Sequence, residues 1–356
     1  MYKIVVMGAG SAQSNGVINC LRKDKEENYI IGMGSDKYDL RLCKAHKKYL
    51  VPHSTKENYK EVLLEILKKE KPDMIHFQHD MELFIAMMFR KEIEDLGVKM
   101  LIPNNETIDT CVFKYKSWEK FKAAGLIVPN NLIINNESNL KNAFEKLGNE
   151  EGMIWLRSIS IGGGGKGSLP TNDYETALDW INSNNGWGTF SAAEMLTKNT
   201  VTWLSIWYQG ELIVCQGRKR KSWAHSALSP SGVTGVTKIG ETISSAQVDE
   251  IAEKACKAVS NKPHGVYGVD LTYDKNGIPN PTEINIGRFF TTVQFFAEAG
   301  LNMPLILKNL CLYGKKPDLI RIKNPLKDGL LWIRAMDCDP VLTTEEEIDR
   351  ELYTEE

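Results

Sequence analysis

A hairpin signal between residues 265 and 285 constrains the fold of this chain more than any other feature. Asn276-Gly277 separates two runs in which apolar residues alternate, and this dipeptide is typical of a type I′ turn, whose two central residues need a positive φ. A two-residue turn at this point predicts that Asp270 lies directly opposite Glu283. Because alternate residues of a strand share a face, Asn285 is expected beside both carboxylates.

Two carboxylates and an amide on one sheet face form an all-oxygen group that suits a hard cation. Like charges that face each other across a sheet are destabilising unless a cation offsets them. Asp270, Glu283 and Asn285 are therefore predicted to bind Mg²⁺ or Mn²⁺. The alternative is a solvated polar face on an edge hairpin, which is the commoner fate of a lone acidic residue.

The amino-terminal third alternates between strand and helix patterns. Apolar runs at residues 3–7, 29–32, 74–78 and 99–102 are separated by a glycine turn and by helical patterns that include residues 59–69 and 81–97. Parallel strands need such crossovers, so residues 1–105 are predicted to form a Rossmann-like parallel α/β domain. Gln13 replaces the third glycine of the Gly8-Ala9-Gly10 dinucleotide fingerprint, which favours a structural turn.

The rest of the chain is predicted to hold α+β units, so the fold class is mixed α/β and α+β. Residues 106–199 combine strands and helices with a glycine-rich loop. Residues 200–320 carry antiparallel strand signals at 201–208 and 212–220, a helix at 245–259 and the hairpin. Residues 321–356 carry a final strand and an acidic tail.

The glycine-rich loop follows a strand that ends in a cation. Arg157 precedes four consecutive glycines, Gly162, Gly163, Gly164 and Gly165. Glycines let backbone N–H groups approach an anion closely, so this loop suits a nucleoside triphosphate. It lacks the glycine at 160 and the Ser or Thr at 167 that a Walker P-loop needs, and a flexible surface loop is the alternative.

A second basic segment lies at residues 217–221. Arg218 and Arg220 are two apart in a strand pattern, so both are expected on one face, where they could hold a carboxylate or a transferring phosphoryl group. A solvated run of charges is the alternative.

Composition narrows the class of function. With 46 Asp+Glu against 44 Lys+Arg, the net charge is -2, which argues against a broad cationic surface for nucleic acid. No apolar stretch approaches the ~20 residues that a membrane span requires. The seven cysteines are widely spaced without a C-x-x-C pair, which favours a reducing, cytoplasmic setting and no zinc site.

The order of these features resembles the ATP-grasp superfamily, in particular stand-alone proteins similar to the large subunit of carbamoyl phosphate synthetase. The resemblance rests on Asp270, on Glu283-Ile284-Asn285 and on Arg288, which follow the glycine loop, and it covers residues 3 to about 315. It implies an ATP-grasp fold preceded by a Rossmann-like α/β domain.

The resemblance also implies roles for individual residues. Asp270, Glu283 and Asn285 would hold the metal against the phosphates of ATP, and the glycine loop would cover them as a lid. Lys114 and Arg157 would be the cations that contact the phosphates, and Glu194-Met195-Leu196 would be the hinge that binds adenine. Arg288 would hold the acyl phosphate or carboxylate, and Arg220 would be a further catalytic cation.

The implied activity is an ATP-dependent, ADP-forming ligation of a small-molecule carboxylate to an amine through an acyl phosphate. Asp80, Glu82, Thr291 and Thr292 are expected to contribute to substrate specificity. Three alternatives remain open: phosphorylation of bicarbonate or carbamate, a nucleotide-binding regulatory module without activity, and a nicotinamide-dependent oxidoreductase. A homodimer is the expected assembly for a cytoplasmic enzyme of this kind.

Overall fold

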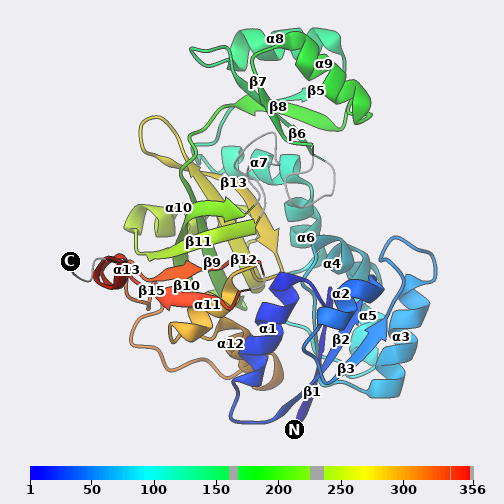
Figure 1. Ribbon diagram of the computed structural model, residues 1–356. Coiled ribbons are helices and arrows are strands. Elements are labelled where there is room, and N and C mark those ends of the chain that lie inside the picture. The colour runs from blue at the N-terminus through cyan, green and yellow to red at the C-terminus, as the bar shows by residue number, and fades with distance from the viewer. Residues whose placement is uncertain (160–166, 225–235, 337, 353–356) are drawn as a thin grey trace.

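Three sheets organise the chain in the computed structural model, which describes residues 1–159, 167–224, 236–336 and 338–352 (Figure 1). The first is a four-stranded sheet near the amino terminus, the second a four-stranded sheet in a small lobe, and the third a seven-stranded sheet between them. The candidate site lies on the third sheet, so the other two matter here for what they bring to it.

The first sheet is parallel and has the order β3-β2-β1-β4. Its strands are β1 (Tyr2–Val6), β2 (Asn28–Gly34), β3 (Lys47–Leu50) and β4 (Met74–His76), and its first helices are α1 (Ala12–Arg22), α2 (Lys37–Leu42) and α3 (Tyr59–Glu70). The glycine turn after β1 lets Ala9 N–H donate to the carbonyl oxygen of Met33 at 2.8 Å. The predicted Rossmann-like arrangement is confirmed.

Two predicted elements of this region are wrong. The helix expected over residues 81–97 is divided into α4 (Asp80–Ala86), a 3₁₀ turn η1 (Met87–Phe89) and α5 (Arg90–Asp95). The turn brings Phe89 into the core, where its ring lies 6.5 Å from that of Tyr59, so tertiary packing overrides the helical pattern. The strand expected over residues 99–102 contributes only an isolated bridge between Lys99 and Met74.

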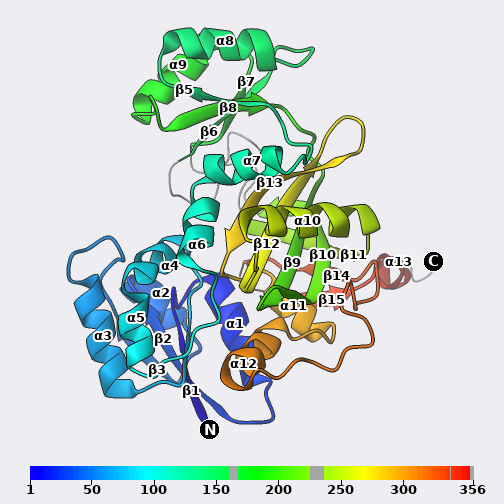
Figure 2. The same ribbon diagram turned by 180° about the vertical axis from the view of Figure 1, so that it is seen from behind.

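The small lobe stands apart from the rest of the molecule in both views (Figures 1 and 2). Its antiparallel sheet has the order β5-β8-β6-β7, and its strands are β5 (Asn131–Ile134), β6 (Ile154–Ser158), β7 (Leu169–Thr171) and β8 (Phe190–Glu194). Two amphipathic helices, α8 (Glu137–Leu147) and α9 (Tyr174–Ser183), bury their apolar sides in a core of the lobe's own. Helices α6 (Asn105–Val112) and α7 (Lys114–Ala123) precede it.

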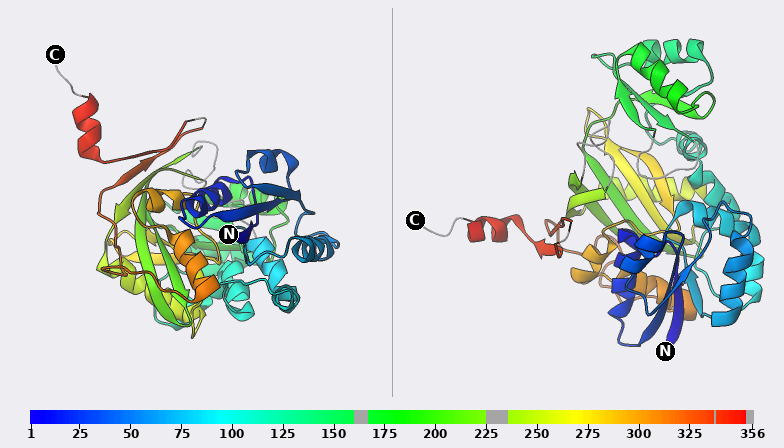
Figure 3. Two further views of the ribbon diagram at one scale, coloured as in Figure 1. Left: turned by 90° about the horizontal axis from the view of Figure 1, so that it is seen from below. Right: turned by 45° about the vertical axis from the view of Figure 1, so that its right-hand side comes forward.

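The seven-stranded sheet is antiparallel and has the order β13-β12-β9-β10-β11-β14-β15. Its strands are β9 (Thr200–Tyr208), β10 (Glu211–Ala224), β11 (Val236–Ile243), β12 (Gly265–Tyr273), β13 (Pro279–Ile286), β14 (Leu331–Ile333) and β15 (Val341–Thr343). Helices α10 (Ala246–Val259), α11 (Val293–Glu298) and α12 (Met303–Tyr313) accompany it. At the end of the chain, α13 (Glu345–Leu352) projects away from the body (Figure 3).

The β12–β13 hairpin confirms the predicted pairing but corrects the predicted turn. Asp270 pairs with Glu283, yet the loop spans residues 274–278, and Gly277 has a positive φ of 76° whereas Asn276 does not. A type I′ turn needs both, so the turn type is wrong. The longer loop moves the register by one residue, and a bulge at Thr282, beside Pro281, moves it back.

Two hydrophobic cores join the first domain to the seven-stranded sheet. One contains Val5 and Ile75 of the parallel sheet together with Trp203 and Val269, and the other contains Ile4 and Val6 together with Leu204 and Val266. Successive residues of a strand point to opposite faces, so both faces of each sheet are covered. The two parts therefore pack as one body. No helix in the described ranges is long and apolar enough to span a membrane.

Candidate functional site

Polar side chains form a row across four strands of the seven-stranded sheet. Glu283 of β13 pairs with Asp270 of β12, Asp270 pairs with Thr202 of β9, and Thr202 pairs with Arg218 of β10. Residues that pair directly share a face of the sheet, so these four side chains stand side by side. We use "polar row" for Glu283, Asp270, Thr202 and Arg218.

Asp270 lies at the centre of a hydrogen-bond network. Its Oδ1 accepts hydrogen bonds from Thr202 Oγ1 at 2.6 Å and from Arg220 Nη2 at 2.9 Å, and its Oδ2 accepts one from Asn285 Nδ2 at 3.0 Å. Thr202 Oγ1 in turn accepts hydrogen bonds from Arg220 and from Arg218. The structure thus brings Asn285 to Asp270, as predicted from the sequence, and also brings Arg220 there, which was not predicted.

Glu283 is held by cations from two other elements. Lys114 Nζ, at the start of α7, lies 2.7 Å from Glu283 Oε2, and Arg157 Nη2, on β6 of the small lobe, donates to the carbonyl oxygen of Thr282 at 3.4 Å. Burial alone would raise the pKa of Glu283, but the charges of Lys114, Arg157 and Arg288 outweigh it and hold the pKa at about 2. Glu283 is therefore an anion at neutral pH.

Arg288 connects the polar row to the first domain. Its Nε donates to Asp80 Oδ1 at 2.5 Å and its Nη2 donates to Asp80 Oδ2 at 3.1 Å, while Nη2 also donates to Asn285 Oδ1. Such a bidentate pair fixes the plane of the guanidinium. Among the described residues Arg288 Nη1 has no hydrogen-bond partner.

The segment that carries Arg288 packs closely on α4. Gly287 has a φ of 69°, and a Cβ built on it would lie 2.3 Å from Leu83 Cδ2. The next amide, Phe289 N–H, donates to Gln78 Oε1 at 2.8 Å. A glycine is needed here both for the positive φ and for the close approach.

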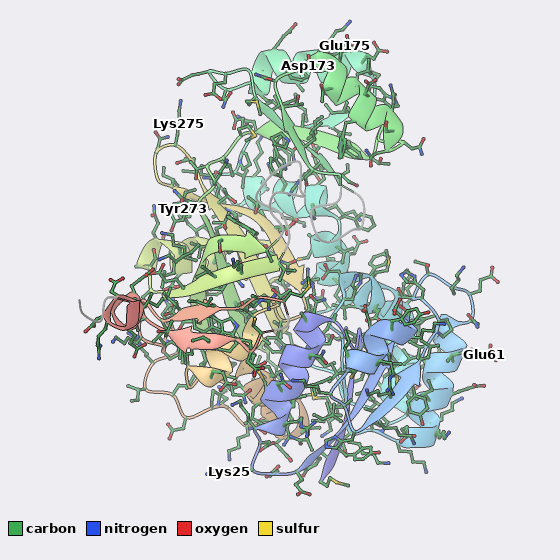
Figure 4. All side chains as sticks on the ribbon, in the orientation of Figure 1. Lys25, Glu61, Asp173, Glu175, Tyr273 and Lys275 are labelled. Atoms are coloured by element: carbon green, nitrogen blue, oxygen red, sulfur yellow. The ribbon has the colours of Figure 1, made fainter. Side chains whose placement is uncertain are left out.

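The predicted adenine hinge lies between the small lobe and the large sheet. Glu194 ends β8, and both of its carboxylate oxygens accept hydrogen bonds from Asn130. Thr197 N–H donates to the carbonyl oxygen of Tyr273, which lies at the loop end of the β12–β13 hairpin in Figure 4. Within the described chain, the backbone amide and carbonyl groups of Met195 and Leu196 have no hydrogen-bond partner, so they are available to a flat polar ring.

The predicted metal ligands provide an all-oxygen set. In the part of the chain that the structure describes, no group of three or more His, Cys, Asp or Glu side chains could hold a metal ion, so the set depends on the Asn285 amide in addition to Asp270 and Glu283. Two carboxylates and an amide oxygen fit Mg²⁺ or Mn²⁺ in chemistry. The predicted lid residues Gly162, Gly163, Gly164 and Gly165 lie outside the described residues.

Three site residues escaped the sequence argument or were given no definite role in it. Thr202 carries no chemical signal, and only the pairing of β9 with β12 brings it to Asp270. Asp80 was expected to contribute to specificity, and its contact with Arg288 spans 208 positions of sequence. Arg334 follows β14 and donates from Nη1 to the carbonyl oxygen of Thr291 at 2.9 Å. No spacing rule indicates contacts of this range.

Comparison with known proteins identifies the fold. No family model matches the sequence, and no curated protein matches it significantly. Three solved structures are similar: an L-amino acid ligase from Bacillus licheniformis (12% identity, TM-score 0.68, covering 93% of this chain and 79% of that one), an N5-carboxyaminoimidazole synthetase from Staphylococcus aureus with ADP (13%, 0.70, 99% and 96%), and a biotin carboxylase from Campylobacter jejuni (15%, 0.69, 93% and 75%). The resemblance inferred from the sequence is thereby confirmed at the level of architecture, and the chain has the ATP-grasp fold preceded by a Rossmann-like parallel α/β domain.

Proposed function

We propose that this protein is an ATP-dependent, ADP-forming ligase that joins a small-molecule carboxylate to an amine through an acyl phosphate. The observation that carries the proposal is the convergence on Glu283 and Asp270 of cations from separate elements: Lys114 of α7, Arg157 of β6 and Arg220 of β10. Cations and paired carboxylates at one place are what phosphoryl transfer between two anions requires.

The nucleotide would lie between the small lobe and the large sheet. The free backbone groups of Met195 and Leu196 would meet adenine, and Lys114 and Arg157 would neutralise the phosphates. Asp270, Glu283 and Asn285 would hold Mg²⁺ or Mn²⁺, which supplies positive charge to the phosphate oxygens. Lys114 and Arg220 form ion pairs with two of these ligands, Glu283 and Asp270 respectively.

Arg288 would orient the carboxylate for attack. A carboxylate oxygen attacks the γ-phosphorus of ATP, the bond from that phosphorus to the bridging oxygen breaks, and ADP leaves. The amine nitrogen then attacks the acyl carbon and loses a proton, while inorganic phosphate departs with the electrons of the C–O bond. Asp80 keeps the Arg288 guanidinium in a fixed plane during both steps.

Hydroxylamine trapping tests the proposal. Purified protein is incubated with Mg-ATP, hydroxylamine and pools of carboxylic and amino acids, and both hydroxamate and ADP are measured. We expect hydroxamate and ADP in equal amounts with at least one pool, because hydroxylamine replaces the amine. ADP release that needs only bicarbonate would replace the ligase by the bicarbonate-phosphorylating alternative. Release of AMP, or no release while ATP binds, would refute the proposal.

A further inference from the structure

Strand β10 carries a line of buried donors that lack acceptors. Arg218 Nε, Arg220 Nε, Ser222 Oγ and Trp223 Nε1 are buried and have no hydrogen-bond partner in the described structure. Two register shifts follow Arg220, so Ser222 and Trp223 do not continue the regular alternation of the two arginines. A buried donor without an acceptor is destabilising, so four of them on one strand call for an explanation.

Arg218 is the most buried of these residues, with 1% of its surface exposed. Its Nη1 donates to Thr292 Oγ1 at 2.6 Å, its Nη2 donates to Thr202 Oγ1 at 2.8 Å, and its guanidinium lies 4.3 Å from the centre of the Phe290 ring. Within the described residues it makes no ion pair with a carboxylate. Burial and the nearby charge of Arg220 lower the pKa of Arg218 well below the ordinary value. Keeping this cation buried therefore destabilises the folded state.

A second arginine flanks the same short segment. Arg334 Nη1 donates to the carbonyl oxygen of Thr291, and Arg218 donates to the hydroxyl of the adjacent Thr292. Asp270, an acidic group whose charge acts on Arg218, is already engaged by Arg220, Thr202 and Asn285. Positive charge at this end of the polar row is therefore in excess.

This end lies well away from the place where the phosphates would bind. Lys114 and Arg157 gather at Glu283, whereas Arg218 stands at the opposite end of the polar row, three strands further on. Neighbouring strands are about 4.8 Å apart, so the two ends are separated by roughly 14 Å of sheet. An anionic group bound at Arg218 would therefore not overlap the phosphates at Glu283.

We propose that Arg218, Arg334 and the Thr292 hydroxyl bind an anionic group of the substrate other than the carboxylate that is activated beside Arg288. The substrate is then a dianion, either a dicarboxylate or a phosphorylated carboxylate, since a guanidinium pairs with both kinds of oxyanion. This inference rests on the proposed function. It also accounts for the unpartnered Arg218 Nε, because an oxygen of such a group would accept a hydrogen bond from it.

The effect of Arg218→Met on stability separates a structural role of Arg218 from a role in ligand binding. If Arg218 served only the fold, Arg218→Met would destabilise the protein. If Arg218 is kept for a ligand, replacing a buried cation that lacks an anionic partner by an apolar side chain of similar length should leave the melting temperature unchanged or raise it.

Thermal unfolding without ATP tests both points: the melting temperature in buffer reports stability, and its rise with ligand reports binding of the anion. The probes are succinate against propionate and O-phospho-L-serine against L-serine, which separate a dicarboxylate from a phosphorylated carboxylate. The variants are Arg218→Met and, as a matched control, Arg22→Met, since Arg22 is exposed on α1 and donates only to the carbonyl oxygen of Lys44.

We expect at least one dianion to stabilise the wild type and Arg22→Met more than its matched monoanion does. We expect the apparent affinity of Arg218→Met for that dianion to be at least tenfold weaker, with an unchanged or higher melting temperature in buffer. Arg218→Lys, which keeps the charge but loses the forked geometry, should lie between the two, and it replaces Arg218→Met if that variant does not fold.

Two results would overturn the inference: equal dianion affinity in wild type and Arg218→Met, or no preference of the wild type for either dianion. Because no ATP is present, these results are independent of hydroxamate formation. The second anion site and the ligase activity can therefore fail separately.

Discussion

Asp80 is the residue through which the first domain contacts the candidate site. It accepts two hydrogen bonds from Arg288, and the same guanidinium donates to Asn285 of the predicted metal set. Replacing a residue that only fixes the orientation of another typically lowers activity, although the replaced residue does not contact substrate. Asp80 is therefore a positioning residue in this account.

Asp80→Asn should impair the carboxylate step selectively. The amide keeps one acceptor and loses the second, so Arg288 is held less firmly, and kcat/KM for the carboxylate should fall about 10-fold or more while KM for ATP stays the same. Steady-state kinetics with each substrate varied provide the measurement. Asp95→Asn is the matched control, because Asp95 pairs with Lys91 on an exposed helix surface. An equal loss for both substrates would contradict the assignment.

Glu82 is a buried carboxyl group without a hydrogen-bond partner for Oε2 in the described structure, and 7% of its surface is exposed. Burial raises its pKa to about 8 from the ordinary value of 4.5. The folded state therefore keeps a proton that the unfolded state loses, and this group contributes stability below about pH 4.5 that disappears as the pH rises toward 8. His76, also buried, has its pKa lowered to about 4 from the ordinary value of 6.5. The stability that it contributes above pH 6.5 is therefore lost as the pH falls toward 4.

Glu82→Gln should remove this pH dependence. Relative to the wild type, its free energy of unfolding should increase by about 2–4 kcal/mol between roughly pH 5 and pH 8, measured by urea titration. Tyr59, whose pKa is raised mainly by burial and also by Glu82, loses only the smaller contribution in the variant and stays neutral over this range. Glu92→Gln, in an exposed pair with Lys60, controls for the loss of a carboxylate. A parallel pH profile of wild type and Glu82→Gln would refute the assignment.

The sequence predicts one of the two strand pairings of β12 but not the other. The hairpin pairing of Asp270 with Glu283 is correct, although it arises from a longer loop and a bulge that compensate each other. Proline at position 281 lacks an N–H and sits beside the bulge, a signal that the hairpin rule does not use. The other neighbour of β12 was not predictable in this way, because β9 lies far away in sequence and pairing between distant strands leaves no local pattern.

The contact between α4 and the end of β13 can be tested with one substitution. Gly287→Ala should destabilise the protein by about 2–4 kcal/mol, since a residue with positive φ costs roughly 1–2 kcal/mol and the methyl group would press on Leu83. Because α4 carries Asp80, the carboxylate step should also weaken. Urea unfolding and steady-state kinetics measure the two effects.

Gly277→Ala separates strain from packing. Gly277 also has a positive φ, of 76°, but a Cβ there would meet nothing within 4 Å. This variant should lose only the roughly 1–2 kcal/mol of backbone strain and should keep full activity. Equal effects of the two substitutions on kinetics would show that the α4 contact does not matter for the site.

At the scale of the whole molecule, the candidate site draws on all three sheets. The first domain supplies Asp80, the small lobe supplies Arg157 and the hinge, and the large sheet supplies the polar row. Two continuous cores fix the first domain to the large sheet, so Asp80 and Arg288 are held on a single body. The domain limits expected from the sequence, at residues 105, 199 and 320, and a homodimeric assembly remain predictions.

The measurement that tests the central claim most directly is ADP release from Mg-ATP with pooled carboxylates and amines, for the wild type and Glu283→Gln side by side. We expect carboxylate-dependent release by the wild type that is lowered at least about 100-fold in Glu283→Gln, since the neutral amide no longer balances Lys114 and Arg157 or offers a charged metal ligand. Far-UV circular dichroism should report the same fold for both. Near-wild-type release by the folded Glu283→Gln variant would contradict the account.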